Sequence, residues 1–190
     1  MEKLIEVRWH GRGGQGAVTA SKLLATSALA EDKYIQAFPE YGPERMGAPI
    51  QSFTRISETP IKIHCHVTNP DIVVSLDPAL LGVVDVTEGL TEDGVLIINT
   101  EESPAQIREK LNLKGRKVYT VDASKIAQET IGRPLPNTPL IGALIKATGL
   151  LKLDKVLTDI EDKFKKKFSS KIVEGNINAI KRAYQEVKGE

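Results

Sequence analysis

The stretch WHGRGGQGA, residues 9–17, places four glycines within six residues near the start of the chain. An apolar run, Leu4–Trp9, precedes the glycines and predicts a short β-strand. A run rich in small and apolar residues, Ala17–Ala30, follows them and predicts an α-helix. A glycine-rich turn between a strand and a helix is typical of α/β proteins in which the backbone passes close to a ligand or to the sheet.

The rest of the chain alternates strand-like and helix-like segments, which predicts a mostly parallel sheet with helices on both faces. The strand-like segments are Tyr34–Phe38, Ile50–Ile56, Ile61–Val67, Asp71–Leu76, Val95–Asn99 and Lys117–Val121. Helices are predicted to start at Asp77-Pro78, at Ala123 and at Thr138-Pro139, and two amphipathic helices follow from Leu153 onward.

A β-hairpin is predicted in the first half of the chain. Ile50–Ile56 and Ile61–Val67 are joined by only four residues, 57–60, so we expect these two strands to pair in antiparallel fashion. The sequence therefore predicts a single α/β domain over residues 1–190. Its expected form is a Rossmann-like, mostly parallel sheet with helices on both faces, an inserted β-hairpin and C-terminal helices.

Composition narrows the classes of function. Hydrophobic residues make up 41% and charged residues 27% of the chain, as in ordinary soluble proteins, and the net charge of +1 favours neither nucleic acid nor membrane partners. The one cysteine, Cys65, excludes an internal disulfide and an iron–sulfur cluster, which requires several thiolates. No apolar run reaches the roughly 18 residues of a membrane span, and the first residues lack signal-peptide features, so we expect a cytoplasmic protein.

Gly11, Gly13 and Gly16 match the pattern G-x-G-x-x-G between the predicted strand and helix. Glycine permits the positive φ of a tight turn, and bare backbone lets a phosphate approach the N-terminus of the next helix. The alternative is that the glycines only form a turn and let the helix pack on the sheet. A nicotinamide enzyme also requires an acidic residue at the tip of its second strand, but Glu40 opens a loop rich in proline and glycine, residues 39–49, which weakens that interpretation.

Other polar residues allow two interpretations each. His64 and His66 flank Cys65 as metal ligands would, but strand alternation places Cys65 in the core and the histidines on the opposite face, and a closed metal site needs more ligands. His10, at the end of the first strand, either lies near a ligand or caps a turn. Asp77 also ends a strand, and the proline after it favours a role as a helix cap.

Two motifs in this order carry a family resemblance. HGRGGQGA, residues 10–17, is followed by YGPERMGAP, residues 41–49, in which Met46 stands where a second basic or small residue is common. Together they resemble the gamma subunits of the 2-oxoacid:ferredoxin oxidoreductases, most closely those of the pyruvate enzyme. DIVVSLDPALL, residues 71–81, and more loosely NTPLIG, residues 137–142, resemble later landmarks, so the similarity extends over nearly the whole chain.

The resemblance implies a place in a multi-subunit enzyme that converts pyruvate, coenzyme A and oxidised ferredoxin into acetyl-coenzyme A, carbon dioxide and reduced ferredoxin. It implies that thiamine diphosphate and the [4Fe–4S] clusters lie on partner subunits, named alpha, beta and delta, and that the gamma subunit covers the coenzyme A site. The chain has neither the cysteines for a cluster nor the G-D-G and N-N signature of thiamine diphosphate binding. We therefore expect no catalytic residue, no metal and no complete cofactor site on it.

The residues expected to contact coenzyme A come from the two motifs. The glycine turn is expected to hold a phosphate or to line its channel, and Arg12 or Arg45 to pair with a phosphate through a forked contact. The candidate binding residues are Gly11, Arg12, Gly13, Gly14, Gln15, Gly16, Arg45 and Gly47. Two other classes of function stay open at this point: a stand-alone NAD(P)-binding oxidoreductase and a nucleotide-binding regulatory module.

Overall fold

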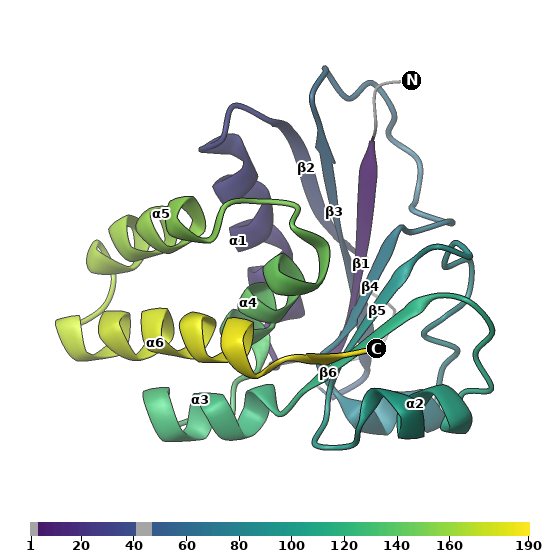
Figure 1. The fold of residues 1–190 in the computed structure, drawn as a ribbon. Helices are drawn as coiled ribbons and strands as arrows, with labels where there is room; N and C mark the ends of the chain where they lie inside the picture. The colour runs from purple at the N-terminus through teal and green to yellow at the C-terminus, as the bar shows by residue number, and fades with distance from the viewer. Residues whose placement is uncertain (1–3, 41–46) are drawn as a thin grey trace.

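The computed structural model describes residues 4–40 and 47–190, which form one seven-stranded sheet with helices on both faces (Figure 1). The strands in this described part are β1 (Ile5–Arg12), β2 (Tyr34–Glu40), β3 (Pro49–Ser57), β4 (Ile72–Ser75), β5 (Val95–Asn99), β6 (Lys117–Val121) and β7 (Lys188–Gly189). The α-helices are α1 (Ala17–Leu29), α2 (Pro104–Lys110), α3 (Ala123–Ile131), α4 (Asn137–Thr148), α5 (Leu153–Lys165) and α6 (Ser170–Glu186), and a short 3-10 helix, η1, spans Pro78–Gly82.

The strand order is β2-β3-β1-β4-β5-β6-β7. Neighbours within β1-β4-β5-β6 are parallel, whereas β3 is antiparallel to both β1 and β2, and β7 is antiparallel to β6. All strands of the sheet except β3 and β7 therefore run in one direction, which confirms the predicted fold class. Because the carboxyl ends of β1 and β4 meet at one edge, the glycine turn after β1 lies beside the start of η1 after β4.

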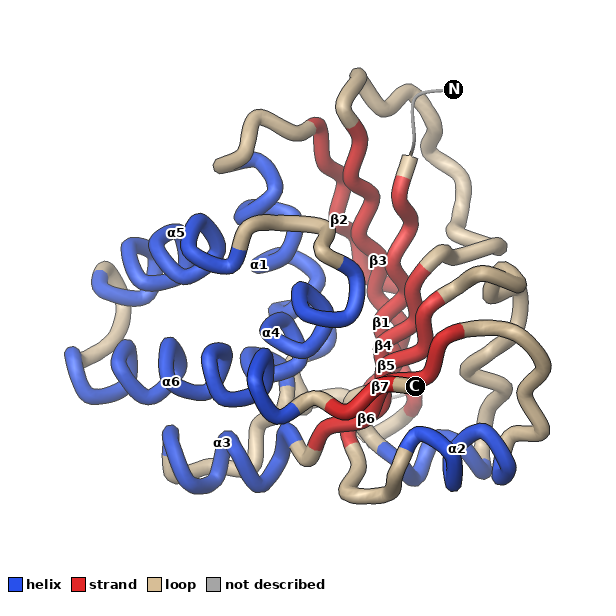
Figure 2. The backbone as a smooth tube through the Cα atoms, in the orientation of Figure 1, coloured by secondary structure: helices blue, strands red, loops and turns tan. Residues whose placement is uncertain are grey.

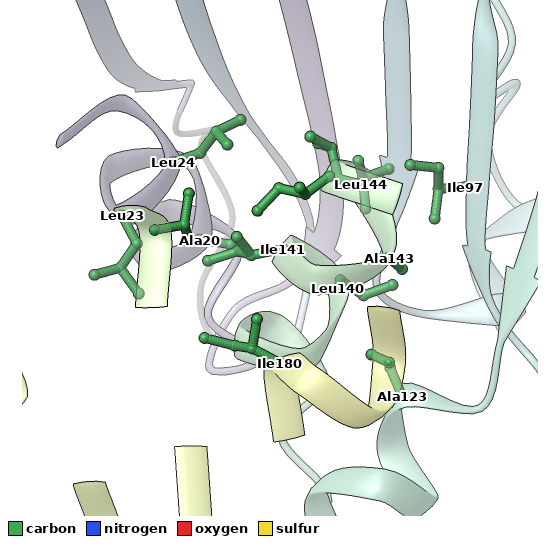
Figure 3. Packing of buried hydrophobic residues seen from close by; sticks show 14 of the residues in the cluster. Ala20, Leu23, Leu24, Ile97, Ala123, Leu140, Ile141, Ala143, Leu144 and Ile180 are labelled. Atoms are coloured by element: carbon green, nitrogen blue, oxygen red, sulfur yellow. The ribbon is translucent and has the colours of Figure 1, made fainter. Parts of the chain in front are cut away.

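The larger of two cores lies between the sheet and the helices α1, α3, α4, α5 and α6 (Figure 2). Alternation along the strands sends Trp9 of β1 and Ile97 of β5 to this face. They join the same buried cluster as Leu140 of α4 and Ile180 of α6. Figure 3 shows Ile97, Leu140 and Ile180 in this cluster. The helix α4 is apolar on nearly all sides because it lies between the sheet and α6.

A smaller core covers the opposite face of the sheet, where α2 lies apart from the other helices (Figure 2). Leu96 and Ile98 of β5 pack there with Leu80 of η1 and Ile107 of α2. Central parallel strands that are covered on both sides are apolar on both faces, as β4 and β5 are. The prediction of helices on both faces is confirmed.

The predicted hairpin of Ile50–Ile56 with Ile61–Val67 is wrong. The first of these segments belongs to β3, which pairs with β1 along one edge and with β2 along the other, so the inserted antiparallel pair is β2 with β3. Since both edges of β3 are occupied, residues 61–67 cannot pair with it, and they form no strand. They are held instead by contacts such as the hydrogen bond from Arg55 Nη2 to the carbonyl oxygen of Cys65, at 2.8 Å.

The C-terminal region follows the prediction. The helix α4 ends at Gly149, which caps it with a φ of 63°, and α5 and α6 are the two amphipathic helices. Two elements, α2 and β7, are not predicted from the sequence. Within the described residues, none of the helices combines the length and the apolar character that crossing a membrane requires.

Candidate functional site

The turn of Gly13–Gly16 connects β1 to α1 at the carboxyl edge of the sheet. Gly14 has a φ of 98° and Gly16 a φ of 87°, in the left-handed region that costs other residues about 1–2 kcal/mol. Gly16 is also the N-cap of α1, and a Cβ at this position would lie 2.7 Å from the side-chain nitrogen of Asn137 in α4. The glycines are therefore required both for the backbone conformation and for the approach of α4.

Gln15 closes the turn and connects it to the end of β4. Its Oε1 accepts a hydrogen bond from the backbone nitrogen of Arg12 at 2.7 Å, and its Nε2 donates to Asp77 Oδ2 at 3.1 Å. Asp77 Oδ2 also accepts from Arg12 Nε at 2.8 Å, while its Oδ1 accepts from the backbone nitrogen of Ala79 at 2.9 Å. Asp77 thus caps η1, as predicted, and in addition anchors the glycine turn.

Arg12 joins the turn to the segment that begins at Gly47. Its Nη1 donates to the carbonyl oxygen of Gly47 at 3.1 Å, and the backbone nitrogen of Gly13 donates to the carbonyl oxygen of Ala48 at 3.2 Å. The Arg12 side chain is 31% exposed, and its Nη2 forms no hydrogen bond within residues 4–40 and 47–190. Part of this cation is therefore available to an anion while its ion pair with Asp77 fixes its position.

The structure brings most of the predicted binding residues together. Gly11 is the penultimate residue of β1, where an added Cβ would lie 3.2 Å from the Cβ of Ala17, so this glycine serves the packing of α1. Gly47 meets the turn through Arg12. Arg45, with the rest of residues 41–46, lies outside the described residues.

The chemistry of this edge suits an anion. The helix α1 starts without a side-chain cap and without an acidic residue in its first turn. The free N–H groups at such a helix start and the helix dipole favour a phosphate or carboxylate group. The Asp77 carboxylate accepts three hydrogen bonds and thereby positions the turn.

Two contacts of this site were not predicted from the sequence. One is the anchoring of the glycine turn by Asp77, and the other is the contact of Asn137 with that turn. Both residues stand in segments that carry the family resemblance, Asp77 after β4 and Asn137 at the start of α4. Their relation to the glycines depends on β4 lying next to β1 and on α4 crossing beside α1. The chain order alone does not give that arrangement.

Glu40 does not occupy the position of a ribose-binding carboxylate. It ends β2, and β3 separates β2 from β1 in the sheet, whereas dinucleotide-binding folds place the second strand directly beside the first. The Oε2 of Glu40 lies 3.8 Å from Nδ1 of His66 instead. This geometry disfavours the nicotinamide interpretation.

His10 does not cap a turn, because its side chain forms no hydrogen bond within residues 4–40 and 47–190. It is 2% exposed and lies on the face of β1 opposite Trp9, on the side of the smaller core. Its Nε2 has no hydrogen-bond partner within the part of the chain that is described. Burial, and then the neighbouring Arg8, lower the pKa of His10 to about 3, so the imidazole is neutral at neutral pH.

The interpretation of Cys65 as a core residue is wrong. Cys65 is exposed, as are His64 and His66, because residues 61–67 do not form a strand and do not alternate between two faces. Among the described residues, no group of three or more His, Cys, Asp or Glu side chains is arranged to hold a metal ion.

Comparison with known proteins identifies close relatives. Residues 6–186 match the protein family described as pyruvate ferredoxin/flavodoxin oxidoreductase. The chain is 51% identical over 185 residues to the pyruvate/ketoisovalerate oxidoreductases common subunit gamma of Pyrococcus abyssi, with 97% of this chain and 98% of the relative covered.

Solved structures show the same likeness. The chain is 44% identical in sequence to pyruvate oxidoreductase subunit PORC from Thermotoga maritima. It superimposes on the crystal structure of that subunit with a TM-score of 0.87, and the match covers 99% of each chain. A 2-oxoglutarate:ferredoxin oxidoreductase from Magnetococcus marinus shares the fold at 17% identity and a TM-score of 0.78, with 97% of this chain matching 31% of that longer one.

Proposed function

Since the chain belongs to the pyruvate ferredoxin/flavodoxin oxidoreductase family, we propose that it is the gamma subunit of a multi-subunit pyruvate:ferredoxin oxidoreductase. The observation that carries this proposal is its identity of 51% to a gamma subunit along essentially the full length of both chains. The whole enzyme converts pyruvate, coenzyme A and oxidised ferredoxin into acetyl-coenzyme A, carbon dioxide and reduced ferredoxin. A stand-alone NAD(P)-dependent enzyme is disfavoured because Glu40 lies two strands away from the glycine turn.

The redox chemistry belongs to partner subunits in this proposal. Thiamine diphosphate supplies the decarboxylation, and [4Fe–4S] clusters carry electrons to ferredoxin; we assign both to alpha, beta and delta subunits. The donor set of this chain does not fit a cluster, because it contains one cysteine where several thiolates are required. That exposed free thiol is also suited to the reducing cytoplasm expected from the sequence.

The contribution of this chain is to cover the coenzyme A site with the glycine turn. A phosphate of coenzyme A is held by the N–H groups at the start of α1 and by the guanidinium of Arg12, which its ion pair with Asp77 and its hydrogen bond to Gly47 keep in place. Arg45, from the second motif, is the other cation that we assign to the phosphate. The whole of residues 1–190 acts as one domain in this role.

Affinity purification tests the proposal. The chain is tagged, expressed at native level in its own cells and purified without oxygen, and the proteins that accompany it are identified by mass spectrometry. We expect a thiamine diphosphate-binding chain and a ferredoxin-like chain rich in cysteine. Recovery of this chain alone, with micromolar affinity for NADH, would contradict the proposal and favour the dehydrogenase.

A further inference from the structure

A groove on the helical side of the molecule, with a volume of about 1000 Å³, lies outside the glycine turn. It lies between the carboxyl-terminal end of α3, the start of α4 and the connection from α5 to α6, on the face of the sheet that carries these helices (Figure 1). Its apolar lining includes three of the large hydrophobic side chains that the described surface exposes, namely Leu135 at 36%, Phe168 at 46% and Ile172 at 40%. Apolar side chains gathered in one groove indicate an interaction site, whereas single exposed ones do not.

The rim of the groove is positively charged. Its cations are Arg133, Lys163, Lys166, Lys167 and Lys171. Lys163 pairs with Asp159, but the other four form no ion pair within residues 4–40 and 47–190. The one carboxylate in the lining, Glu129, already pairs with Arg182 at 2.9 Å. The groove therefore combines an apolar floor with about four uncompensated positive charges around it.

We propose that this groove is the docking surface for an acidic amphipathic helix of a partner subunit, an inference that rests on the proposed membership in a multi-subunit oxidoreductase. The apolar face of such a helix covers Leu135, Phe168 and Ile172, and its carboxylates meet the four unpaired cations. The groove also reaches the candidate site, since Asn137 lines it and touches the turn at Gly16. A docked helix thus contacts Asn137, the residue of α4 that also lies against the glycine turn.

The charge distribution argues against other occupants. Two copies of this chain that met through the same surface would bring identical lysines face to face, because a twofold contact is made by one patch with itself. Duplex nucleic acid binds mainly through its phosphates on a polar basic surface. The bases of a single strand stack on aromatic rings, and the aliphatic side chains of Leu135 and Ile172 in this floor offer none. Opposite charge together with apolar complementarity selects the acidic amphipathic segment.

Cross-linking of the purified complex tests the contact directly. A water-soluble carbodiimide joins an amine to a carboxylate that touches it, without a spacer. We expect Lys166, Lys167 or Lys171 to become joined to an Asp or Glu of another subunit, and these three lysines to be protected from acetylation in the complex relative to the free chain. Equal acetylation in both states would overturn the proposal.

Matched variants measure the charge and the apolar contribution separately. Lys166→Glu with Lys167→Glu is compared with Lys155→Glu and Lys181→Glu, which are exposed lysines of α5 and α6 outside the groove. We expect the first pair to weaken subunit association about tenfold or more at roughly 0.1 M salt, and the second pair to leave it unchanged. Circular dichroism of each free variant verifies that the fold is kept.

The apolar floor is tested by Phe168→Ser beside Leu29→Ser, a control at the exposed end of α1. Phe168→Ser is expected to weaken association about tenfold at high as well as low salt, because its contribution is not electrostatic.

The results separate this inference from the proposed function. An enzyme that reduces ferredoxin with pyruvate but assembles equally well with both lysine pairs would overturn the docking surface alone. A complex in which the groove is protected but pyruvate reduces no ferredoxin would overturn the proposed function alone. Protection of the lysines by self-association of the free chain, or by nucleic acid, would also overturn the docking proposal.

Discussion

At the residue scale, Asp77 connects three parts of the candidate site. It accepts hydrogen bonds from Arg12, from Gln15 and from the start of η1, so one carboxylate holds the glycine turn, its cation and the end of β4. The glycines could be predicted because their pattern is local to one turn. The hydrogen bonds of the turn to Asp77 and Gly47 could not be predicted in this way. They form because β3 and β4 lie on either side of β1 in the sheet, which brings both residues next to the turn.

Asp77→Ala is expected to lower the free energy of unfolding by about 1–3 kcal/mol, because it removes a helix cap and the partner of a partly buried arginine. In the assembled enzyme it is expected to raise the KM for coenzyme A, since Arg12 loses its anchor. Urea unfolding and steady-state kinetics measure the two effects. Glu174→Ala, an exposed position on α6, is the control, and equal stability of the two variants would refute the anchor role.

Gly16→Ala and Gly14→Ala separate backbone conformation from packing. Both glycines have positive φ, but an added Cβ meets Asn137 only at Gly16, while the space at Gly14 is open. We expect Gly14→Ala to cost about 1–2 kcal/mol and Gly16→Ala to cost more. The double variant Gly16→Ala with Asn137→Ala should recover part of the extra loss in urea unfolding; an equal loss in both single variants would contradict this account.

The buried His10 predicts a pH dependence of stability. In the unfolded chain His10 takes up a proton below about pH 6.5, whereas burial in the folded chain holds its pKa at about 3. Folded stability is therefore fully present above about pH 6.5 and is lost as the pH falls toward 3, by up to about 1.4 kcal/mol per pH unit.

Urea unfolding between pH 7 and about pH 4.5 measures this slope. His10→Leu is expected to flatten it, because the variant has no group to protonate there, while His64→Leu at an exposed position should leave it unchanged. Equal slopes for His10→Leu and the natural chain would show that His10 does not resist protonation in the fold.

At the element scale, local pattern predicted most strands and helices but not their partners. β5, β6 and the ends of α4 follow from short apolar runs and from Gly149, which act within a few residues. The hairpin failed because residues 61–67 alternate like a strand, yet β1 and β2 already occupy both edges of β3. Pairing is a property of the whole sheet, so no local signal excluded it.

The missed helix α2 had a local signal. Ser103 accepts a hydrogen bond from the backbone of Gln106, whose side chain accepts from the backbone of Ser103 in return, and Pro104 stands at the first helical position. This capping box can be recognised from the sequence. The strand β7 has no comparable signal, because its two residues are ordered by pairing with β6.

The contact of α4 with α6 makes a prediction at the same scale. A Cβ at Gly142 would lie 2.1 Å from the carbonyl oxygen of Ile180, so the two helices approach at this glycine. Gly142→Ala is expected to force them apart and to cost about 2–4 kcal/mol. Gly149→Ala, where nothing lies near the added atom, is expected to cost about 1 kcal/mol from its positive φ. Thermal unfolding compares them, and a smaller loss at Gly142 would contradict the close contact.

At the scale of the whole molecule, two cores share one sheet, which favours a single folding unit. The sheet strands contribute side chains to both clusters, so neither core can open without exposing the other side of the same strands. We expect the isolated chain to unfold in one cooperative transition, with equal calorimetric and van't Hoff enthalpies. Two separated transitions in calorimetry would show that the chain is divided.

We propose that this chain works as a subunit of a pyruvate-oxidising, ferredoxin-reducing enzyme and serves its coenzyme A site. The most direct test is to assemble the partner subunits with and without this chain, under anaerobic conditions, and to measure pyruvate-dependent ferredoxin reduction as coenzyme A is varied. We predict that the chain restores reduction at low coenzyme A and that Asp77→Ala requires more coenzyme A for the same rate. Identical rates with and without the chain at every coenzyme A concentration would contradict the claim.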